Sequence, residues 1–246
     1  MKKIILGGVI LMLLSTAMAM AAGQNFEADK IKTSKGDLVI TFLGHGSLIM
    51  SFGGKVIHVD PFSQVADYAQ LPKADLILVT HEHMDHLDLK AINAIKSDKT
   101  MLAVTENVAK TIKEGIILKN SDVQTIRGFK IEAVPAYNLA HMRSPGVPYH
   151  PKGVGNGYII TFDDKRVYIA GDTENTPEMK SLQNIDIAFL PMNLPYTMTP
   201  EMVADAAQAF RPKILYLYHY GDTDTSKLID LLKNEKDIDV RIRKMK

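Results

Sequence analysis

The sequence predicts an α/β fold in which two β-sheets pack together and helices cover their outer faces. Of the 246 residues, 46% are hydrophobic and 23% are charged, a composition that supports an ordinary globular core. Short apolar runs separated by turns alternate with helical segments, and each half of the chain after about residue 23 has strands first and helices later. That order is typical of two packed sheets with helices outside.

The first half begins with three consecutive predicted strands, followed by a fourth strand and two helices. Gly53 and Gly54 join the second and third strands, because paired glycines supply the positive φ angles of a tight hairpin. Apolar runs predict strands at 37–43, 47–52, 55–59 and 76–79, and helical spacing predicts helices at 88–96 and 105–113.

The second half repeats this order of strands and helices. Strand character covers 123–134 and 157–170, the latter with a turn near Asp163 and Asp164. Thr199 as N-cap and Pro200 at the first helical position mark a helix over 201–210. A strand at 214–218, a helix at 226–234 and a strand at 239–243 complete the chain.

The N-terminal segment has the features of a secretory signal. Lys2 and Lys3 precede an apolar run over 4–14, and two Ala-Met-Ala sequences within 17–21 provide small residues at the cleavage positions. The run is shorter than the ~20 apolar residues that a spanning helix needs. We therefore expect a signal peptide at 1–21, one domain at 22–246, a periplasmic or secreted protein, and no stable membrane anchor after cleavage.

Composition restricts the chemistry available to the domain. The chain has no cysteine, which excludes disulfides, thiolate zinc sites and cysteine nucleophiles, so any metal must bind to His, Asp or Glu. The formal net charge is +1, and no polybasic stretch indicates nucleic acid as a partner. A small-molecule substrate is the expected partner.

Several apolar strands end at a residue that can bind a metal. Asp60, His81, Asp172 and His219 each follow such a run. If the strands are neighbours that run the same way, these side chains gather along one edge of the sheets, where ligand sites of α/β proteins form. The alternative for each residue alone is a polar side chain that marks a strand end.

The segment His81-Glu82-His83-Met84-Asp85-His86 is the strongest chemical signal in the chain. Residues 81 and 83 project to the same side of an extended chain and can share one cation, while Asp85 and His86 can reach a second. Three imidazoles and two carboxylates in six residues are costly to bury without a cation. A solvated surface loop is the alternative. The spacing differs from the helical H-E-x-x-H motif of zinc proteases.

Three motifs resemble those of a known family. They are Thr-His-Glu-His-Met-Asp-His-Leu-Asp at 80–88, Ala-Gly-Asp-Thr at 170–173 and Tyr-His-Tyr-Gly at 218–221. With Leu-Gly-His-Gly-Ser at 43–47 and Val-Asp-Pro-Phe at 59–62, they are similar to the metallo-β-lactamase fold superfamily, in its lactonase-like and phospholipase-D-like branch of metal-dependent hydrolases. The resemblance covers 38–221 and implies a four-layer αββα sandwich with a dinuclear metal centre at one edge.

The resemblance also implies a ligand set. His81 and His83 would bind the first metal, Asp85, His86 and His219 the second, and Asp172 would bridge both. The first metal's third histidine is not at its usual place, where this chain has Asn138. We favour His150, because His-Pro-Lys-Gly leads directly into the next strand, over His141 in the middle of the loop; Asn138 as an oxygen ligand is the third option.

Other residues are candidates for supporting roles. Asp60 is expected to orient a ligand imidazole, and His58 to be structural. His45 either orients water or substrate or is a structural imidazole. Tyr196 is a candidate to stabilise developing negative charge. Two divalent ions are expected, with zinc favoured and manganese or iron compatible with the same ligands.

The expected activity is hydrolysis of an ester, lactone, amide or phosphodiester by a metal-bound hydroxide, with Asp85 holding the hydroxide and passing its proton to the leaving group. One alternative is a mononuclear-iron enzyme that uses oxygen on the same fold. Another is an exported metal-binding protein without turnover, which would not need Asp85.

The signal-peptide hypothesis predicts a mature chain that begins between Met20 and Gly23 and lies outside the cytoplasm. The basic, apolar and Ala-x-Ala order of the first 21 residues is the reason. Intact-mass analysis of the protein from its native host tests this, and a soluble cytoplasmic form that retains Met1 would contradict it.

Overall fold

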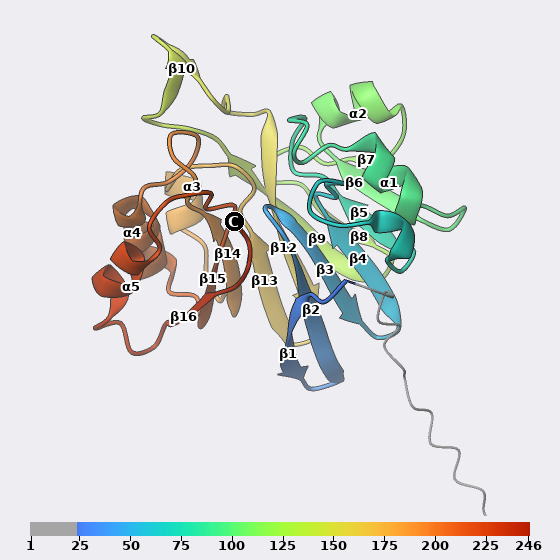
Figure 1. The fold of residues 1–246 in the computed structure, drawn as a ribbon, viewed down its shortest axis with the longest axis horizontal. Coiled ribbons are helices and arrows are strands. Elements are labelled where there is room, and N and C mark those ends of the chain that lie inside the picture. Colours follow the sequence, from blue (N-terminus) through green and yellow to red (C-terminus); the bar gives the residue numbers. More distant parts are fainter. Residues whose placement is uncertain (1–23) are drawn as a thin grey trace, which may run out of the picture.

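A computed structural model describes residues 24–246, so the signal peptide predicted at 1–21 lies outside the described residues. Two seven-stranded sheets face each other, with helices on the outer face of each (Figure 1). The predicted α/β fold, a four-layer αββα sandwich, is confirmed.

The first sheet follows the order of the chain from β1 to β7. Its strands β1 to β4 pair antiparallel and β4 to β7 pair parallel. The strands are β1 (Glu27–Thr33), β2 (Gly36–Gly44), β3 (Ser47–Phe52), β4 (Lys55–Val59), β5 (Leu76–Leu78), β6 (Met101–Val104) and β7 (Ile116–Ile117). The helices on its outer side are the short 3-10 helix η1 (Tyr68–Gln70), α1 (Leu89–Ile95) and α2 (Glu106–Ile112).

The second sheet has the order β16-β15-β14-β13-β12-β9-β8, antiparallel from β8 to β13 and parallel from β13 to β16. The strands are β8 (Val123–Ile126), β9 (Phe129–Ala136), β12 (Gly155–Phe162), β13 (Lys165–Ile169), β14 (Ile187–Pro191), β15 (Ile214–Tyr218) and β16 (Asp239–Ile242). Its helices are α3 (Pro177–Lys180), α4 (Pro200–Phe210) and α5 (Ser226–Leu232). A separate hairpin of β10 (Met142–Ser144) and β11 (Val147–Pro148) lies between β9 and β12 in the chain.

Three apolar layers hold the sandwich together. The central layer lies between the sheets and includes the stacked rings of Phe189 and Tyr216, whose centroids are 5.0 Å apart, beside Phe42. The two outer layers lie between each sheet and its own helices. Because both faces of each sheet are covered at its centre, central strands such as β5 and β14 are continuous apolar runs.

The predicted cap of α4, Thr199, is confirmed, and two other predicted helices begin at residues whose side chains cap them. The side chain of Asp88 accepts hydrogen bonds from the backbone of Lys90 and Ala91, and Thr105 and Thr199 cap α2 and α4 in the same way. All the helices are short, and none within residues 24–246 has the length and apolar character needed to cross a bilayer.

Several strands of the structure differ from the predicted ones. The run at 123–134 is a hairpin of β8 and β9 rather than one strand, because Arg127 and Gly128 take positive φ angles of 53° and 86° and reverse the chain. The fully buried strand β14 was not predicted, since a five-residue apolar run has no distinctive periodicity. The strands β1, β6, β7, β10 and β11 were not predicted either.

The parallel strands place the polar residues that follow them at one edge. In the first sheet, β4 and β5 run parallel and lead to Asp60 and to Thr80 and His81. In the second, β13 and β15 flank β14 and lead to Asp172 and His219. The predicted gathering of strand ends is confirmed in this geometry.

His58 on β4 is a buried histidine away from that edge. Its Nε2 donates a hydrogen bond to the carbonyl oxygen of Pro72 at 3.0 Å, and its side chain is fully buried. Burial lowers the pKa of His58 to about 4, against the weaker opposing effect of the Pro72 carbonyl. The folded protein therefore favours the neutral ring, as expected for a structural imidazole.

This burial predicts an acid-sensitive contribution to stability. The contribution is complete above pH 6.5, where the ring is neutral in both states, and is lost as the pH falls toward 4. Since one pKa unit corresponds to about 1.4 kcal/mol, the native protein should lose roughly 3 kcal/mol more than His58→Gln over this range. Urea unfolding at a series of pH values measures the difference, and parallel curves would refute the prediction.

Candidate metal centre

Imidazole and carboxylate groups converge at this edge in two adjacent groups, and a third group of His81, His86 and Asp172 overlaps both. The ring nitrogens of His81, His83 and His150 lie within 4.8 Å of one another and form the first group. The second group is His45, Asp85, His86 and His219, within the same limit. Asp172 lies between the groups, with its carboxylate oxygens 3.3 Å from Nε2 of His150 and 3.4 Å from Nε2 of His86.

The first group has the geometry of ligands to one ion. Nε2 of His81 and Nδ1 of His83 are 3.1 Å apart. Two nitrogens bound to one tetrahedral zinc at its usual distance of 2.0–2.1 Å stand about 3.3 Å apart, so the observed separation suits a shared cation.

The structure brings His150, and not His141, to the first group. Oδ1 of Asn138 accepts a hydrogen bond from the backbone N–H of His150 at 2.8 Å and lies 2.7 Å from Nδ1 of its ring. Asn138 therefore holds the imidazole with Nε2 toward Asp172. His141 instead faces Glu174, with Nδ1 at 2.8 Å from the carboxylate.

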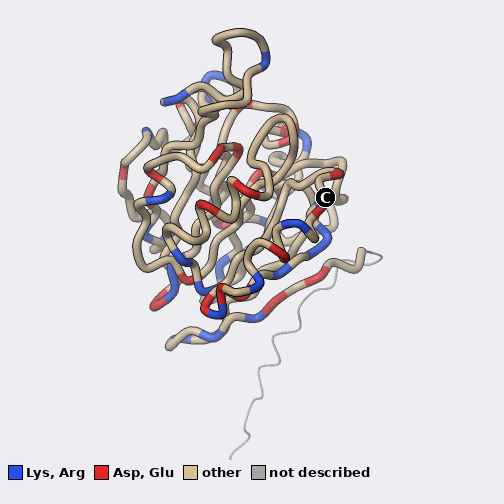
Figure 2. The backbone as a smooth tube through the Cα atoms, turned by 90° about the vertical axis from the view of Figure 1, so that its left-hand side faces the viewer, with Lys and Arg blue, Asp and Glu red and all other residues tan. Residues whose placement is uncertain are grey.

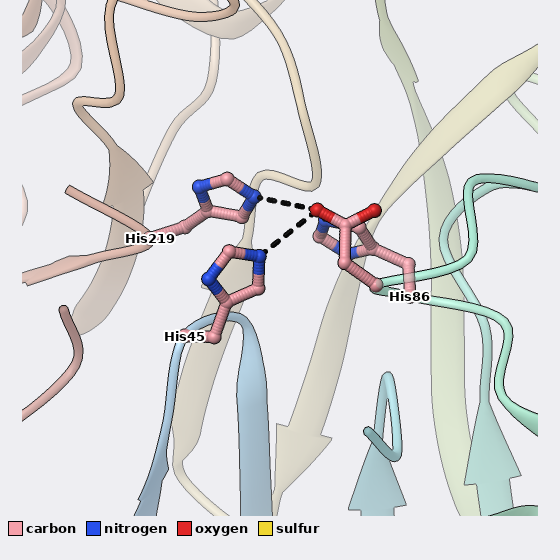
Figure 3. Close-up of side chains that lie close together, drawn as sticks. His45, His86 and His219 are labelled. Carbon is pink, nitrogen blue, oxygen red and sulfur yellow. Dashed lines mark hydrogen bonds and ion pairs between the residues drawn. The ribbon is translucent and has the colours of Figure 1, made fainter. Parts of the chain in front are cut away.

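The second group is centred on the carboxylate of Asp85. Its Oδ2 lies 2.9 Å from Nε2 of His45, 3.5 Å from Nε2 of His219 and 3.8 Å from Nε2 of His86, and Figure 3 shows the three imidazoles around it. The centroids of the His45 and His219 rings are 3.8 Å apart, and the ring planes are tilted by 40° to each other. His45 is thus part of the centre rather than a distant structural residue.

Asp60 orients one imidazole of each group. This fully buried carboxylate accepts hydrogen bonds from the backbone N–H of Thr80 at 2.8 Å, from the Thr80 hydroxyl at 2.7 Å and from Nδ1 of His86 at 2.8 Å. The Thr80 hydroxyl, whose own proton is donated to Asp60, lies 3.0 Å from Nδ1 of His81 and accepts a hydrogen bond from it. Both rings consequently present Nε2 to the centre, which is the usual support of a metal-binding histidine.

The backbone turns sharply where the chain enters the centre. His45, Asp60 and His219 have positive φ angles of 52°, 42° and 46°, which are uncommon for residues other than glycine. Gly171, with φ of 67°, precedes Asp172, and a Cβ there would lie 2.8 Å from the carbonyl oxygen of Asn156. Such conformations persist where the surrounding structure fixes them, and they cluster at functional sites.

Glu174 and Asn193 were not foreseen in the sequence. The buried Glu174 carboxylate accepts hydrogen bonds from the Asn138 side chain at 2.9 Å and from the backbone of residues 139–141 at 2.7 Å each. The Asn193 side chain lies 3.2 Å from Nδ1 of His219. Their partners lie 26 to 36 residues away in the chain, so no local motif marks either residue.

The carboxylates of the centre favour positive charge beside them. Burial opposes ionisation of Asp172, yet the imidazoles of His219 and His86 hold its pKa well below the usual range. Burial likewise opposes protonation of His86, but the carboxylates of Asp172 and Asp60 outweigh it and raise the pKa of that ring. In contrast, burial and the nearby His86 hold the pKa of His81 well below its ordinary value.

The residues present fit a bound divalent cation. Nε2 of His86, His150 and His219 and Oδ1 of Asp172 are buried, and none has a hydrogen-bond partner among the described residues. Buried polar atoms without partners are costly and rare. A cation coordinated by these nitrogen and oxygen atoms would satisfy them and would supply the charge that the carboxylates require.

A cavity of about 770 Å³ opens onto the centre. Its walls include His83, Asp85, His150, Asp172 and His219, together with side chains from three surrounding loops. Tyr196, 45% exposed, lies in this wall with its ring 5.1 Å from that of Tyr149, and it belongs to neither group. The cavity gives a small molecule direct access to both groups.

The amino-acid sequence is similar to those of known metal-dependent hydrolases. The family model described as beta-lactamase superfamily domain matches residues 39–219. A UPF0173 metal-dependent hydrolase of Thermococcus kodakarensis is 33% identical over 199 residues, covering 74% of this chain and 84% of the relative. A similar protein of Pelotomaculum thermopropionicum is 31% identical over 192 residues, with the same coverage.

Solved structures share the fold. A crystal structure of a proposed metal-dependent hydrolase from Parabacteroides distasonis is 54% identical, with a TM-score of 0.86, and covers 90% of this chain and 100% of that one. A metallo hydrolase from Ignicoccus hospitalis is 24% identical, with a TM-score of 0.71 over 85% of this chain and 95% of its own, and shows the fold alone.

Because His150 and His141 have different surroundings, we expect their alanine variants to differ in metal content. His150→Ala should bind metal about as poorly as His83→Ala, because each removes a nitrogen from the first group, while His141→Ala should retain nearly the full metal content. Elemental analysis of the three purified variants measures metal per chain. A metal-replete His150→Ala would show that His150 is not a ligand.

Proposed function

The chain belongs to the beta-lactamase superfamily, and on that premise we propose that it hydrolyses an ester, lactone, amide or phosphodiester at a pair of divalent cations. It is a metal-dependent hydrolase, as its relatives are named. The observation that supports two cations is the presence of two adjacent ligand groups with Asp172 between them.

The proposed ligands follow the geometry of the groups. His81, His83 and His150 would hold one cation, Asp85, His86 and His219 the other, and Asp172 would contact both. Zinc is the proposed metal, since tetrahedral nitrogen and oxygen sets suit it. When bound, the cations would polarise the substrate oxygen and lower the pKa of an attacking water.

Asp85 is the proposed proton carrier. Its carboxylate lines the cavity, and the interactions with His219 and His45 outweigh burial and lower its pKa, so it is ionised at neutral pH. An ionised carboxylate at the cavity wall can accept the proton of the attacking water and return it to the leaving group. His45, at 2.9 Å, fixes its orientation.

Tyr196 is the proposed contact for the substrate. Its side chain lines the cavity and stands among the aromatic and apolar groups at the mouth. From there its hydroxyl can donate to an oxygen that gains negative charge during the reaction.

We also propose that hydrolysis takes place outside the cytoplasm, in the periplasm or the medium. The support is the order of basic, apolar and small residues at 1–21. Export would expose the substrate-binding cavity to compounds outside the cell.

The ligand assignment predicts two different losses of activity. Asp172→Ala should reduce hydrolysis of an activated ester or phosphodiester by at least about 100-fold, because it removes the carboxylate that lies 3.3 Å from a ring nitrogen of one group and 3.4 Å from a ring nitrogen of the other. Asp85→Asn should reduce kcat by about 10²- to 10⁴-fold with smaller loss of metal, because the amide has an oxygen but accepts no proton. Steady-state kinetics beside elemental analysis separate these effects.

The same assay discriminates the alternatives. Native activity should require divalent metal and rise with pH through an apparent pKa near 7 before levelling. Oxygen consumption with one iron per chain would instead indicate the mononuclear-iron enzyme. Two bound metals without turnover on lactones, esters, β-lactams and phosphodiesters would indicate a metal-binding protein.

A further inference from the structure

Among the described residues in the wall of the cavity above the metal centre, one side chain carries a permanent positive charge. Arg143 is that residue, and it lies on the β10–β11 hairpin. The acidic wall residues already have partners: Asp85 and Asp172 belong to the metal centre, and Glu82 accepts a hydrogen bond from the side chain of Asn107 at 3.0 Å. Arg143 is thus the side chain in this wall that is available to an anion.

Arg143 differs from every other arginine of the chain. The remaining five pair with carboxylates, and these pairs are Arg127 with Asp75, Arg166 with Glu132, Arg211 with Glu235, and Arg241 and Arg243 with Asp29. Within residues 24–246, Arg143 has no carboxylate within ion-pair distance. Lys152 in the same loop, by contrast, is paired with Glu178 at 2.8 Å.

The hairpin holds Arg143 beside an aromatic pair. Its guanidinium carbon lies 5.8 Å from the centre of the Tyr149 ring, which in turn packs edge-on against Tyr196 at 5.1 Å. An arginine that packs on an aromatic ring retains its donors for a ligand. The hairpin projects at the top of the molecule in Figure 2, where the tube shows a basic residue in blue and no acidic residue in red. Apart from histidines, Arg143 is the sole charged residue of 139–151.

The cavity wall also includes apolar and aromatic side chains. Phe62, Met84, Tyr149 and Tyr196 are in its wall, and Met84 is 85% exposed. Leu139, Met142, Val147 and Leu194, on the loops around the cavity, are also exposed large hydrophobic residues. Exposed apolar side chains gathered at a cavity mouth mark a binding surface.

We propose that Arg143 binds an anionic group of the substrate, and that the substrate is a small molecule with an apolar segment between the reacting bond and a carboxylate or phosphate. This inference rests on the proposed hydrolase function. The reacting bond would lie at the metal centre, the apolar segment against Tyr149 and Tyr196, and the anion at the guanidinium, whose fork of N–H donors matches carboxylate and phosphate oxygens.

A matched set of substrates tests the proposal on the metal-loaded protein. The set is an aryl ester of a straight-chain acid with a neutral end, its analogue with a terminal carboxylate, and its analogue with a terminal phosphate. The measured quantity is the ratio of kcat/KM for each anionic ester to that for the neutral ester. The larger of the two ratios identifies the anion.

The variants Arg143→Ala, Arg143→Lys and Lys152→Ala complete the design. Arg143→Ala should lower the ratio for the preferred anion by about 10- to 100-fold, the loss typical of a charge-assisted pair. Arg143→Lys should lower it less, since charge remains without the planar fork. Lys152→Ala, which removes an already paired charge from the same loop, should keep the native ratio.

The outcomes separate this inference from the proposed function. An unchanged ratio in Arg143→Ala, or an equal fall in Lys152→Ala, would overturn the role of Arg143 while hydrolysis itself stands. If no ester is hydrolysed, calorimetry measures instead the binding of two free anions to the same variants. These anions are an ω-aryl alkanoate and an alkyl phosphate. Binding lost in Arg143→Ala and kept in Lys152→Ala would then support the anion site without the hydrolase, and equal binding by all variants would overturn it.

Discussion

The buried carboxylate of Asp60 is the contact on which the geometry of the centre depends. It accepts two hydrogen bonds from Thr80 and one from His86, and through the Thr80 hydroxyl it also orients His81. One side chain therefore fixes imidazoles that belong to different ligand groups. Because such second contacts determine which ring nitrogen faces the ion, the relative position of the two proposed cations is set from within the sandwich.

The sheet topology supplies the remaining positions. Parallel strands in each sheet end at the same edge, and the two sheets are held face to face by the apolar layer between them. Residues as distant in sequence as His45 and His219 thereby come into ring contact. The left-handed backbone conformations at these strand ends cost stability. The rigid sheets that hold the strands can offset this cost, whereas a mobile loop cannot.

Sequence reasoning succeeded where residues act through local patterns. The ligand-rich segment 81–86, the capped helices and the polar ends of apolar strands can each be recognised from a few consecutive residues. The structure has a capped helix where one was predicted, and it brings the polar strand ends together with segment 81–86. Asn138 shows the limit of such reasoning: a position expected for a histidine holds an amide that orients His150 twelve residues later. Glu174 and Asn193 were missed for the same reason, because only the folded loops bring them to their partners.

The segment between β9 and β12 combines two proposed tasks, metal binding and recognition of the substrate. Asn138 and His150 lie at its ends and Arg143 on its hairpin. A change in its length therefore alters the proposed ligand of one metal together with the proposed selector of substrate. In evolution or engineering, this loop is constrained to change as a unit: an exchange that brings new substrate contacts must also bring its own histidine and the residue that orients it.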